Sequence, residues 1–133
     1  MITFKVWIPG EGRRVWRYIH IPESETLDAL ATAIIEAYDF DHDHLYQFYF
    51  TSNPWAQGQT TFVHPAADGM KADKIKLSHL RLRPGQTFNL LYDFGDEWRF
   101  KVKMEGLTEA CPDSIQDSSG QGKAPEQYPL ALE

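Results

Sequence analysis

Two short acidic segments hold the side chains of this sequence that are best suited to chemistry. The first, Asp39–His44, alternates three aspartates with other residues and includes both His42 and His44. Carboxylate oxygens of this kind can hold a hard cation, and two imidazoles with a carboxylate can hold a transition metal. The second, Asp93–Glu97, gathers three acids that could act in acid–base chemistry if a partner group lay nearby. These segments favour a metal-assisted hydrolase as one interpretation of the sequence.

The second acidic segment also has a purely structural interpretation. It lies between two extended patterns, so it predicts the turn of a hairpin. In that turn Gly95 is expected to supply a positive φ, and Asp93 and Asp96 are expected to accept hydrogen bonds from their own backbone. Ser78 and His79 are sequence neighbours, which rarely form a nucleophile and base pair. We therefore assign no catalytic residue, no metal ligand and no cofactor.

The elements that must position these residues begin with a hairpin and a helix. Apolar residues alternate over residues 2–8, a turn follows at 9–12, and a second extended segment ends at residue 21. Thr26 or Ser24 can cap a helix whose apolar stripe has helical spacing. The stripe consists of Leu27, Leu30, Ala31, Ile34, Ile35 and Tyr38.

Several more strands are expected after the helix. The alternation predicts strands over residues 45–51, 87–92 and 98–105, a shorter one over 60–64 within an irregular segment, and one helical turn over 76–80. In the last strand Trp98 begins the apolar face, and Arg99, Lys101 and Lys103 form a basic face opposite it. The pattern predicts an α+β fold in which one helix packs on one face of a mostly antiparallel, mixed sheet, with a β-grasp-like order. Residues 1–106 are expected to form a single domain, and residues 107–133 an extended strap or a loose tail.

The composition excludes several classes of protein. The 133 residues suffice for one domain, and 42% of them are hydrophobic, which excludes a disordered chain. The single cysteine, Cys111, excludes an intramolecular disulfide, and no segment is long and apolar enough to span a membrane. A cytoplasmic protein is therefore expected. The net charge of −6 disfavours nucleic-acid binding unless basic residues gather on one face.

Three segments together resemble one family. They are Val15–Arg17 leading into the helix, Asp41–Phe48, and Tyr92–Trp98 with its Tyr-Asp-Phe-Gly-Asp-x-Trp string. They are similar to the plasmid pRiA4b ORF-3-like family, whose members are also labelled mobile-element passenger proteins of TnpR type. Residues 122–128 resemble the Pro-rich C-terminal segment of that family. The resemblance implies a small α+β domain without a known activity, and it departs from many relatives at Phe100, where they have a histidine.

These observations leave three functions open. The first is a noncatalytic protein-interaction or ligand-binding module associated with plasmid or mobile-element genes. The second is the metal-assisted hydrolase, and the third is a DNA-associated accessory factor that uses the basic strand face. The motif positions expected to matter for binding are Trp16, Arg17, His44, Phe48, Tyr92, Asp93, Gly95, Asp96 and Trp98. A protein partner is possible, and no membrane partner is expected.

Overall fold

A seven-stranded antiparallel sheet forms the frame of the molecule. The structure is a computed structural model and describes residues 1–10, 15–107, 116–121 and 127. The strand order is β4-β3-β5-β6-β1-β2-β7, and every pairing between these strands is antiparallel. The strands are β1 (Ile2–Trp7), β2 (Trp16–Ile21), β3 (Tyr46–Tyr49), β4 (Thr61–Val63), β5 (Thr87–Tyr92), β6 (Trp98–Leu107) and β7 (Gln116–Gln121).

The helix α1 (Leu27–Ala37) forms where the apolar stripe predicts it, with Thr26 as its N-cap. The Thr26 hydroxyl accepts a hydrogen bond from the Ala29 amide at 3.1 Å, which satisfies one of the unpaired donors of the first turn. Two short 3₁₀ helices, η2 (Ala72–Lys74) and η3 (Leu77–Leu80), follow the irregular segment. The single helical turn expected over residues 76–80 is therefore confirmed.

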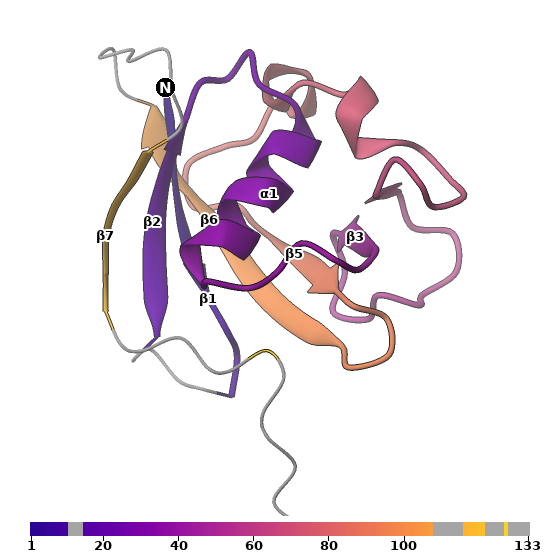
Figure 1. Ribbon diagram of the computed structural model, residues 1–133. Helices are drawn as coiled ribbons and strands as arrows, with labels where there is room; N and C mark the ends of the chain where they lie inside the picture. The colour runs from indigo at the N-terminus through magenta and orange to yellow at the C-terminus, as the bar shows by residue number, and fades with distance from the viewer. Residues whose placement is uncertain (11–14, 108–115, 122–126, 128–133) are drawn as a thin grey trace, which may run out of the picture.

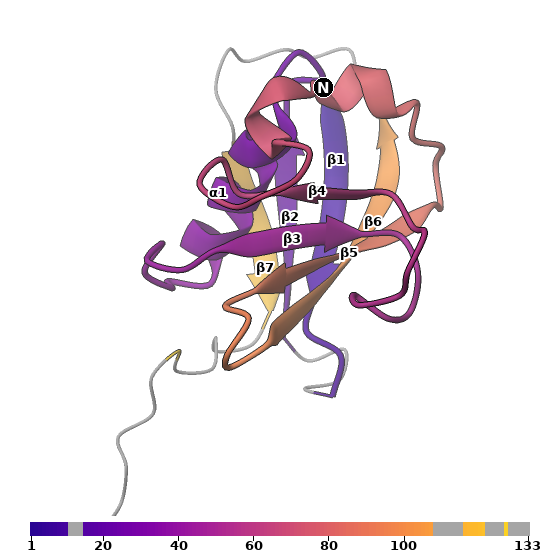
Figure 2. The same cartoon turned by 90° about the vertical axis from the view of Figure 1, so that its right-hand side faces the viewer.

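The core lies between α1 and one face of the sheet. Figure 1 shows α1 lying across the sheet, and its buried residues pack against buried side chains of β1, β2, β5 and β6. Phe4, Ile19, Phe88 and Val102 are fully buried examples. Figure 2 shows β3 and β4 running across β1 and β2, so the sheet is strongly twisted. The twist lets one short helix cover most of the inner face.

Among the described residues, only one end of the other face of the sheet is covered. Over β3 and β5 the segment 51–59 lies on this face: the Asn89 amide donates to the Thr51 carbonyl at 3.0 Å, and the Gln47 amide donates to the Pro54 carbonyl at 2.7 Å. Leu91, which lies beneath it, is fully buried. Over β1, β2 and β6 the outward side chains keep part of their surface exposed.

The predicted α+β class is confirmed, with two refinements. The expected mixed character of the sheet is limited, within the described residues, to one isolated parallel bridge between Val63 and Lys71. The β-grasp-like order is not confirmed, because the second neighbour of β1 is β6, which runs antiparallel to it. No helix in the described part of the chain is long and apolar enough to cross a membrane.

Candidate functional site

The two acidic segments meet where β3 begins and β5 ends. β3 and β5 are paired with Tyr46 opposite Tyr92, so the residues that precede β3 lie beside those that follow β5. The Asp93 amide donates to the Leu45 carbonyl at 2.9 Å and extends this pairing by one step. The sheet register therefore places His44 next to Asp93, a proximity that spacing along the chain could not reveal.

The hydroxyl of Tyr92 is the centre of the polar contacts between these segments. It accepts hydrogen bonds from the amides of Asp43 at 2.8 Å and His44 at 3.2 Å, and it donates a short hydrogen bond to the Asp41 carbonyl. The hydroxyl also lies 3.2 Å from Asp43 Oδ1, so its one proton and two lone pairs are all engaged. Burial raises the pKa of Tyr92 above its ordinary value, which keeps the hydroxyl protonated and able to donate.

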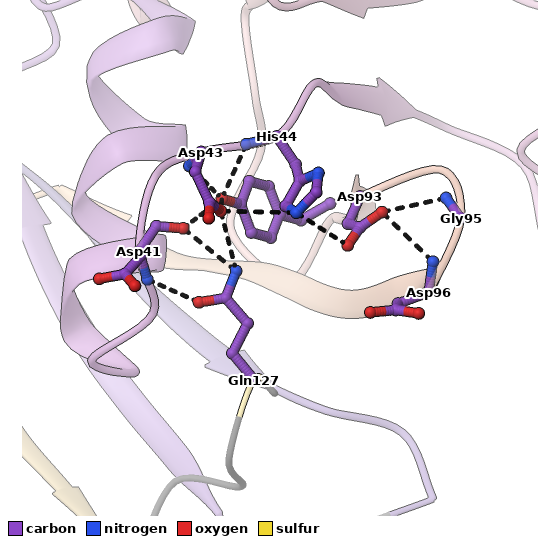
Figure 3. Close-up of polar contacts among 8 residues, drawn as sticks. Asp41, Asp43, His44, Asp93, Gly95, Asp96 and Gln127 are labelled. Carbon is purple, nitrogen blue, oxygen red and sulfur yellow. Dashed lines mark hydrogen bonds and ion pairs between the residues drawn. The ribbon is translucent and has the colours of Figure 1, made fainter. Parts of the chain in front are cut away.

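Gln127 reaches the same loop from the far end of the chain. Its side-chain oxygen accepts from the Asp41 amide at 2.6 Å, and its nitrogen donates to the Asp41 carbonyl at 3.1 Å and to Asp43 Oδ1 at 3.3 Å. The glutamine is only 8% exposed. Motif reasoning did not select this residue, although the resemblance over residues 122–128 pointed to its segment. Figure 3 shows it directly beneath the Asp41–Asp43 loop.

His44 and Asp93 form the part of the network that most resembles catalytic machinery. The His44 Nε2 atom lies 3.4 Å from Asp93 Oδ2 and 3.6 Å from Asp43 Oδ1. The Asp93 side chain is 8% exposed and that of His44 is 38% exposed, so a buried carboxylate faces a partly accessible imidazole. Buried aspartates orient general-base histidines in this way, but such a base acts on a nucleophile. Both of these contacts of the His44 ring are to carboxylates instead.

The other oxygen of Asp93 closes the turn between β5 and β6. Asp93 Oδ1 accepts from the amides of Gly95 at 3.0 Å and Asp96 at 3.3 Å, as the structural interpretation predicted for Asp93. The prediction for Gly95 is wrong. The left-handed residues of this turn are Asp93, with φ 65°, and Glu97, with φ 54°, while Gly95 is not among the positive-φ glycines. Aspartate tolerates this conformation because its side chain bonds to the local backbone.

A shallow cavity opens beside this network. It is lined by His42, Asp43, His44, Leu45 and His64. The rings of His42 and His64 are 5.7 Å apart, and Nδ1 of His64 accepts from the Ala66 amide at 2.9 Å. Sequence reasoning missed His64, which lies far from the motif along the chain. Within the described residues, no group of three or more His, Cys, Asp or Glu side chains is arranged to hold a metal ion.

Arg17 contacts the end of α1, and Phe48 contacts the core. The Arg17 guanidinium donates to the carbonyl of Ala37, the last residue of α1, at 3.2 Å and lies over the Tyr38 ring. A cation here suits the negative end of the helix dipole. Phe48 is fully buried and packs against Phe88 in the core.

The two motif tryptophans lie apart from Tyr92. Trp16 is on the outer face of β2, where Lys5 Nζ lies 5.2 Å from its ring centroid. Trp98 packs on Phe40 with ring centroids 5.0 Å apart, and its indole nitrogen is buried without a hydrogen-bond partner in the described part of the chain. Phe100 packs against Tyr38 and Phe40 in the core, so a histidine at this position would lie beside those two rings. Cys111 lies outside the described residues.

Comparison with known proteins gives a family and a related fold. The family model described as plasmid pRiA4b ORF-3-like protein matches residues 1–127. A crystal structure of a protein of unknown function from Methanosarcina mazei Go1, MM3350, is similar with a TM-score of 0.74 and 28% identity. That likeness covers 93% of this chain and 71% of the other. No curated protein matches the chain. Neither the family nor the related structure is described by an activity.

Proposed function

We propose that this chain, which belongs to the plasmid pRiA4b ORF-3-like family, is a noncatalytic binding module. One observation supports this most directly: the side chains of Tyr92, Asp93 and His44 are engaged with one another or with the backbone of the two acidic segments. The Tyr92 hydroxyl contacts three backbone groups and Asp43 Oδ1, and one oxygen of Asp93 accepts from the turn while the other faces His44. Binding is therefore assigned to surfaces outside this network.

The metal-assisted hydrolase is less well supported. A hydrolytic metal site needs about three protein ligands and an open position for water. The residues described here offer no such group, and two of the carboxylates are already engaged: Asp93 with the turn amides and His44, and Asp43 with Gln127 and His44. A site built from these residues would have to break the contacts that hold the loop 41–44 against β5.

The role of the C-terminal residues is part of the same proposal. We treat residues 1–106 as the domain and residues 107–133 as a C-terminal strap, whose described parts include β7 and Gln127. The pairing of β7 with β2 and the hydrogen bonds of Gln127 to the Asp41–Asp43 loop support this division of the chain. A cytoplasmic location and an association with plasmid or mobile-element genes complete the proposal; the wording of the family description supports the association with a plasmid.

The test is a turnover assay on the whole purified chain and on Asp93→Asn. Carboxylic and phosphoric ester substrates are offered with and without Mg²⁺, Mn²⁺ or Zn²⁺, and metal binding is followed by calorimetry at millimolar concentration. The proposal expects no rate above the buffer control and no heat of metal binding. Turnover that Asp93→Asn abolishes, with an unchanged unfolding curve, would overturn it.

A further inference from the structure

Aromatic and basic side chains gather on the part of the outer sheet face that no described segment covers. The inner face packs on α1, and the segment 51–59 covers the outer face over β3 and β5. What remains over β1, β2 and β6 is a patch of partly exposed residues, here called the open patch. It consists of Lys5, Trp7, Trp16, Tyr18, Lys101 and Lys103.

The register of the sheet arranges the open patch in two rows. Lys5 lies between Tyr18 on β2 and Lys103 on β6. In the next row on the same face, Trp7 lies between Trp16 and Lys101. Directly paired residues have Cβ atoms about 5 Å apart, so each row sets aromatic rings and ammonium groups side by side. Lys5, Trp7, Trp16 and Lys103 also line a hollow on this surface.

The aromatic rings of the patch are held in place by their neighbours. The rings of Trp16 and Tyr18 meet edge to face with centroids 5.1 Å apart. Lys5 Nζ lies 5.2 Å from the centre of the Trp16 ring, a cation–π contact that fixes both side chains. Rings that are already ordered lose little conformational entropy when a flat partner stacks on them.

This face is positively charged, whereas the whole chain has a net negative charge. The chain has a net charge of −6, yet the outward positions of β1 and β6 carry Lys5, Arg99, Lys101 and Lys103. Arg99 is paired with Glu97 at 2.7 Å, and Lys103 lies 3.9 Å from Glu105. Lys5 and Lys101 have no carboxylate partner within the described residues. The open patch is therefore the place where basic residues gather on one face, the condition under which an acidic chain can attract phosphates.

We propose that the open patch binds single-stranded nucleic acid. Cations that track a phosphate backbone, together with aromatic rings on which bases stack, are the two features of single-strand binding surfaces. The inference names a ligand class for the noncatalytic role proposed above and rests on it.

Duplex recognition fits the structure less well. Helices that enter the major groove present basic and amide side chains to the bases. The exposed residues of α1 include Glu36, which repels phosphates, and the opposite face of the helix is buried on the sheet. Rings on a sheet surface can stack only on bases that are already unpaired.

Fluorescence anisotropy of a labelled polythymidine strand of about 12 nucleotides, within the usual range of site sizes, tests the proposal. With three or four phosphate contacts, the logarithm of the binding constant should fall with the logarithm of salt concentration with a slope of about −2 to −3. Trp16→Ala and Tyr18→Ala should each weaken binding about 5-fold or more. The triple change Lys5→Gln, Lys101→Gln and Lys103→Gln should weaken binding and reduce the slope by about 2.

Control variants outside the open patch test whether losing any lysine or any exposed tryptophan would weaken binding equally. Lys74→Gln with Lys76→Gln removes cations near η2 and η3, and Trp55→Ala removes a tryptophan that is 52% exposed elsewhere. Both controls should bind as the wild type does. Binding that is absent at low salt, equal in patch and control variants, equal for a duplex, or equal for a single thymidine nucleotide would overturn the proposal. Each of these outcomes leaves the result of the turnover assay unaffected, so the two proposals fail separately.

Discussion

At the scale of single residues, the two carboxylate oxygens of Asp93 contact two different parts of the molecule. One oxygen accepts the Gly95 and Asp96 amides, and the other faces the His44 ring. The residue adopts a left-handed backbone, which aspartate tolerates better than most residues. The acidic motif therefore builds the turn and also holds it against the loop that follows α1.

The same turn predicts that Gly95→Ala is well tolerated. The φ of Gly95 is outside the left-handed region, and an added Cβ would lie 3.4 Å from Asp93 Oδ1, an ordinary contact. The free energy of unfolding should stay the same or rise by up to about 1 kcal/mol, because alanine restricts the unfolded chain. Gly69→Ala is the matched control: its φ is 131° and its Cβ would lie 3.3 Å from Val63, so a loss of about 1 kcal/mol or more is expected. Urea denaturation measures the free energy of unfolding of both variants. A decrease of more than about 1 kcal/mol in Gly95→Ala would contradict the turn described here.

Residue types predicted the existence of this turn but not which positions take its left-handed conformations. Glycine is the usual occupant of a positive φ, so the sequence favoured Gly95 over Asp93 and Glu97. The choice depends on where β5 and β6 stop pairing, which is a property of the sheet. Likewise, the contact of His44 with Asp93 depends on the register of Tyr46 with Tyr92, which no local pattern specifies.

At the scale of elements, two tyrosines join the ends of α1 to the sheet. Near the N-terminal end, the Tyr46 hydroxyl on β3 donates a short hydrogen bond to Asp28 in the first turn. At the C-terminal end, the Tyr38 hydroxyl bonds to the carbonyls of Val6 at 3.1 Å and Val15 at 3.2 Å. The helix is thereby tied to β3, to β1 and to the residue that precedes β2.

These two phenols predict a loss of stability at alkaline pH. Burial raises the pKa of both, and the Asp28 carboxylate raises that of Tyr46 further, so the unfolded chain ionises first. Stability from each group is complete below the ordinary value of 10.0 and falls above it, by about 1.4 kcal/mol per pH unit. Urea denaturation between about pH 9 and 11 measures this slope, which Tyr38→Phe and Tyr46→Phe should each reduce. Equal slopes in the wild type and both variants would show that these hydroxyls do not respond in this way.

Element prediction succeeded where periodicity was strong. The stripe from Leu27 to Ile35 and its cap at Thr26 predicted α1, and alternation predicted β1, β2, β5 and β6. The segment 51–59 had no periodicity, and its place over the outer face depends on side chains that bond to distant backbone, such as Gln47 and Asn89. The partial cover that leaves the open patch exposed could not be predicted for this reason.

At the scale of the whole molecule, Gln127 connects the last described part of the chain to the loop after α1. Its hydrogen bonds to Asp41 and Asp43 join positions more than eighty residues apart. The two acidic segments and this glutamine form one network because the sheet brings the ends of β3 and β5 together. In our proposal the family motif therefore has a structural role, and the open patch binds the ligand.

Gln127→Ala should loosen the loop without unfolding the molecule. The Asp41 amide would lose its acceptor, so its hydrogen exchange should become faster, while the free energy of unfolding falls by about 1 kcal/mol. Gln47→Ala makes the same truncation at the segment 51–59, and it should leave Asp41 exchange unchanged. Unchanged Asp41 exchange in Gln127→Ala would mean that the glutamine does not hold this loop in solution.

The central claim is that the Tyr92 network holds the fold, and Tyr92→Phe tests it most directly. The substitution keeps the buried ring and removes the hydroxyl that serves the amides of Asp43 and His44 and the carbonyl of Asp41. Urea denaturation of this variant beside the wild type should show a loss of about 1–3 kcal/mol with an unchanged dependence on denaturant. An unfolding free energy equal to that of the wild type would contradict this claim, because it would mean that the motif is not required for stability.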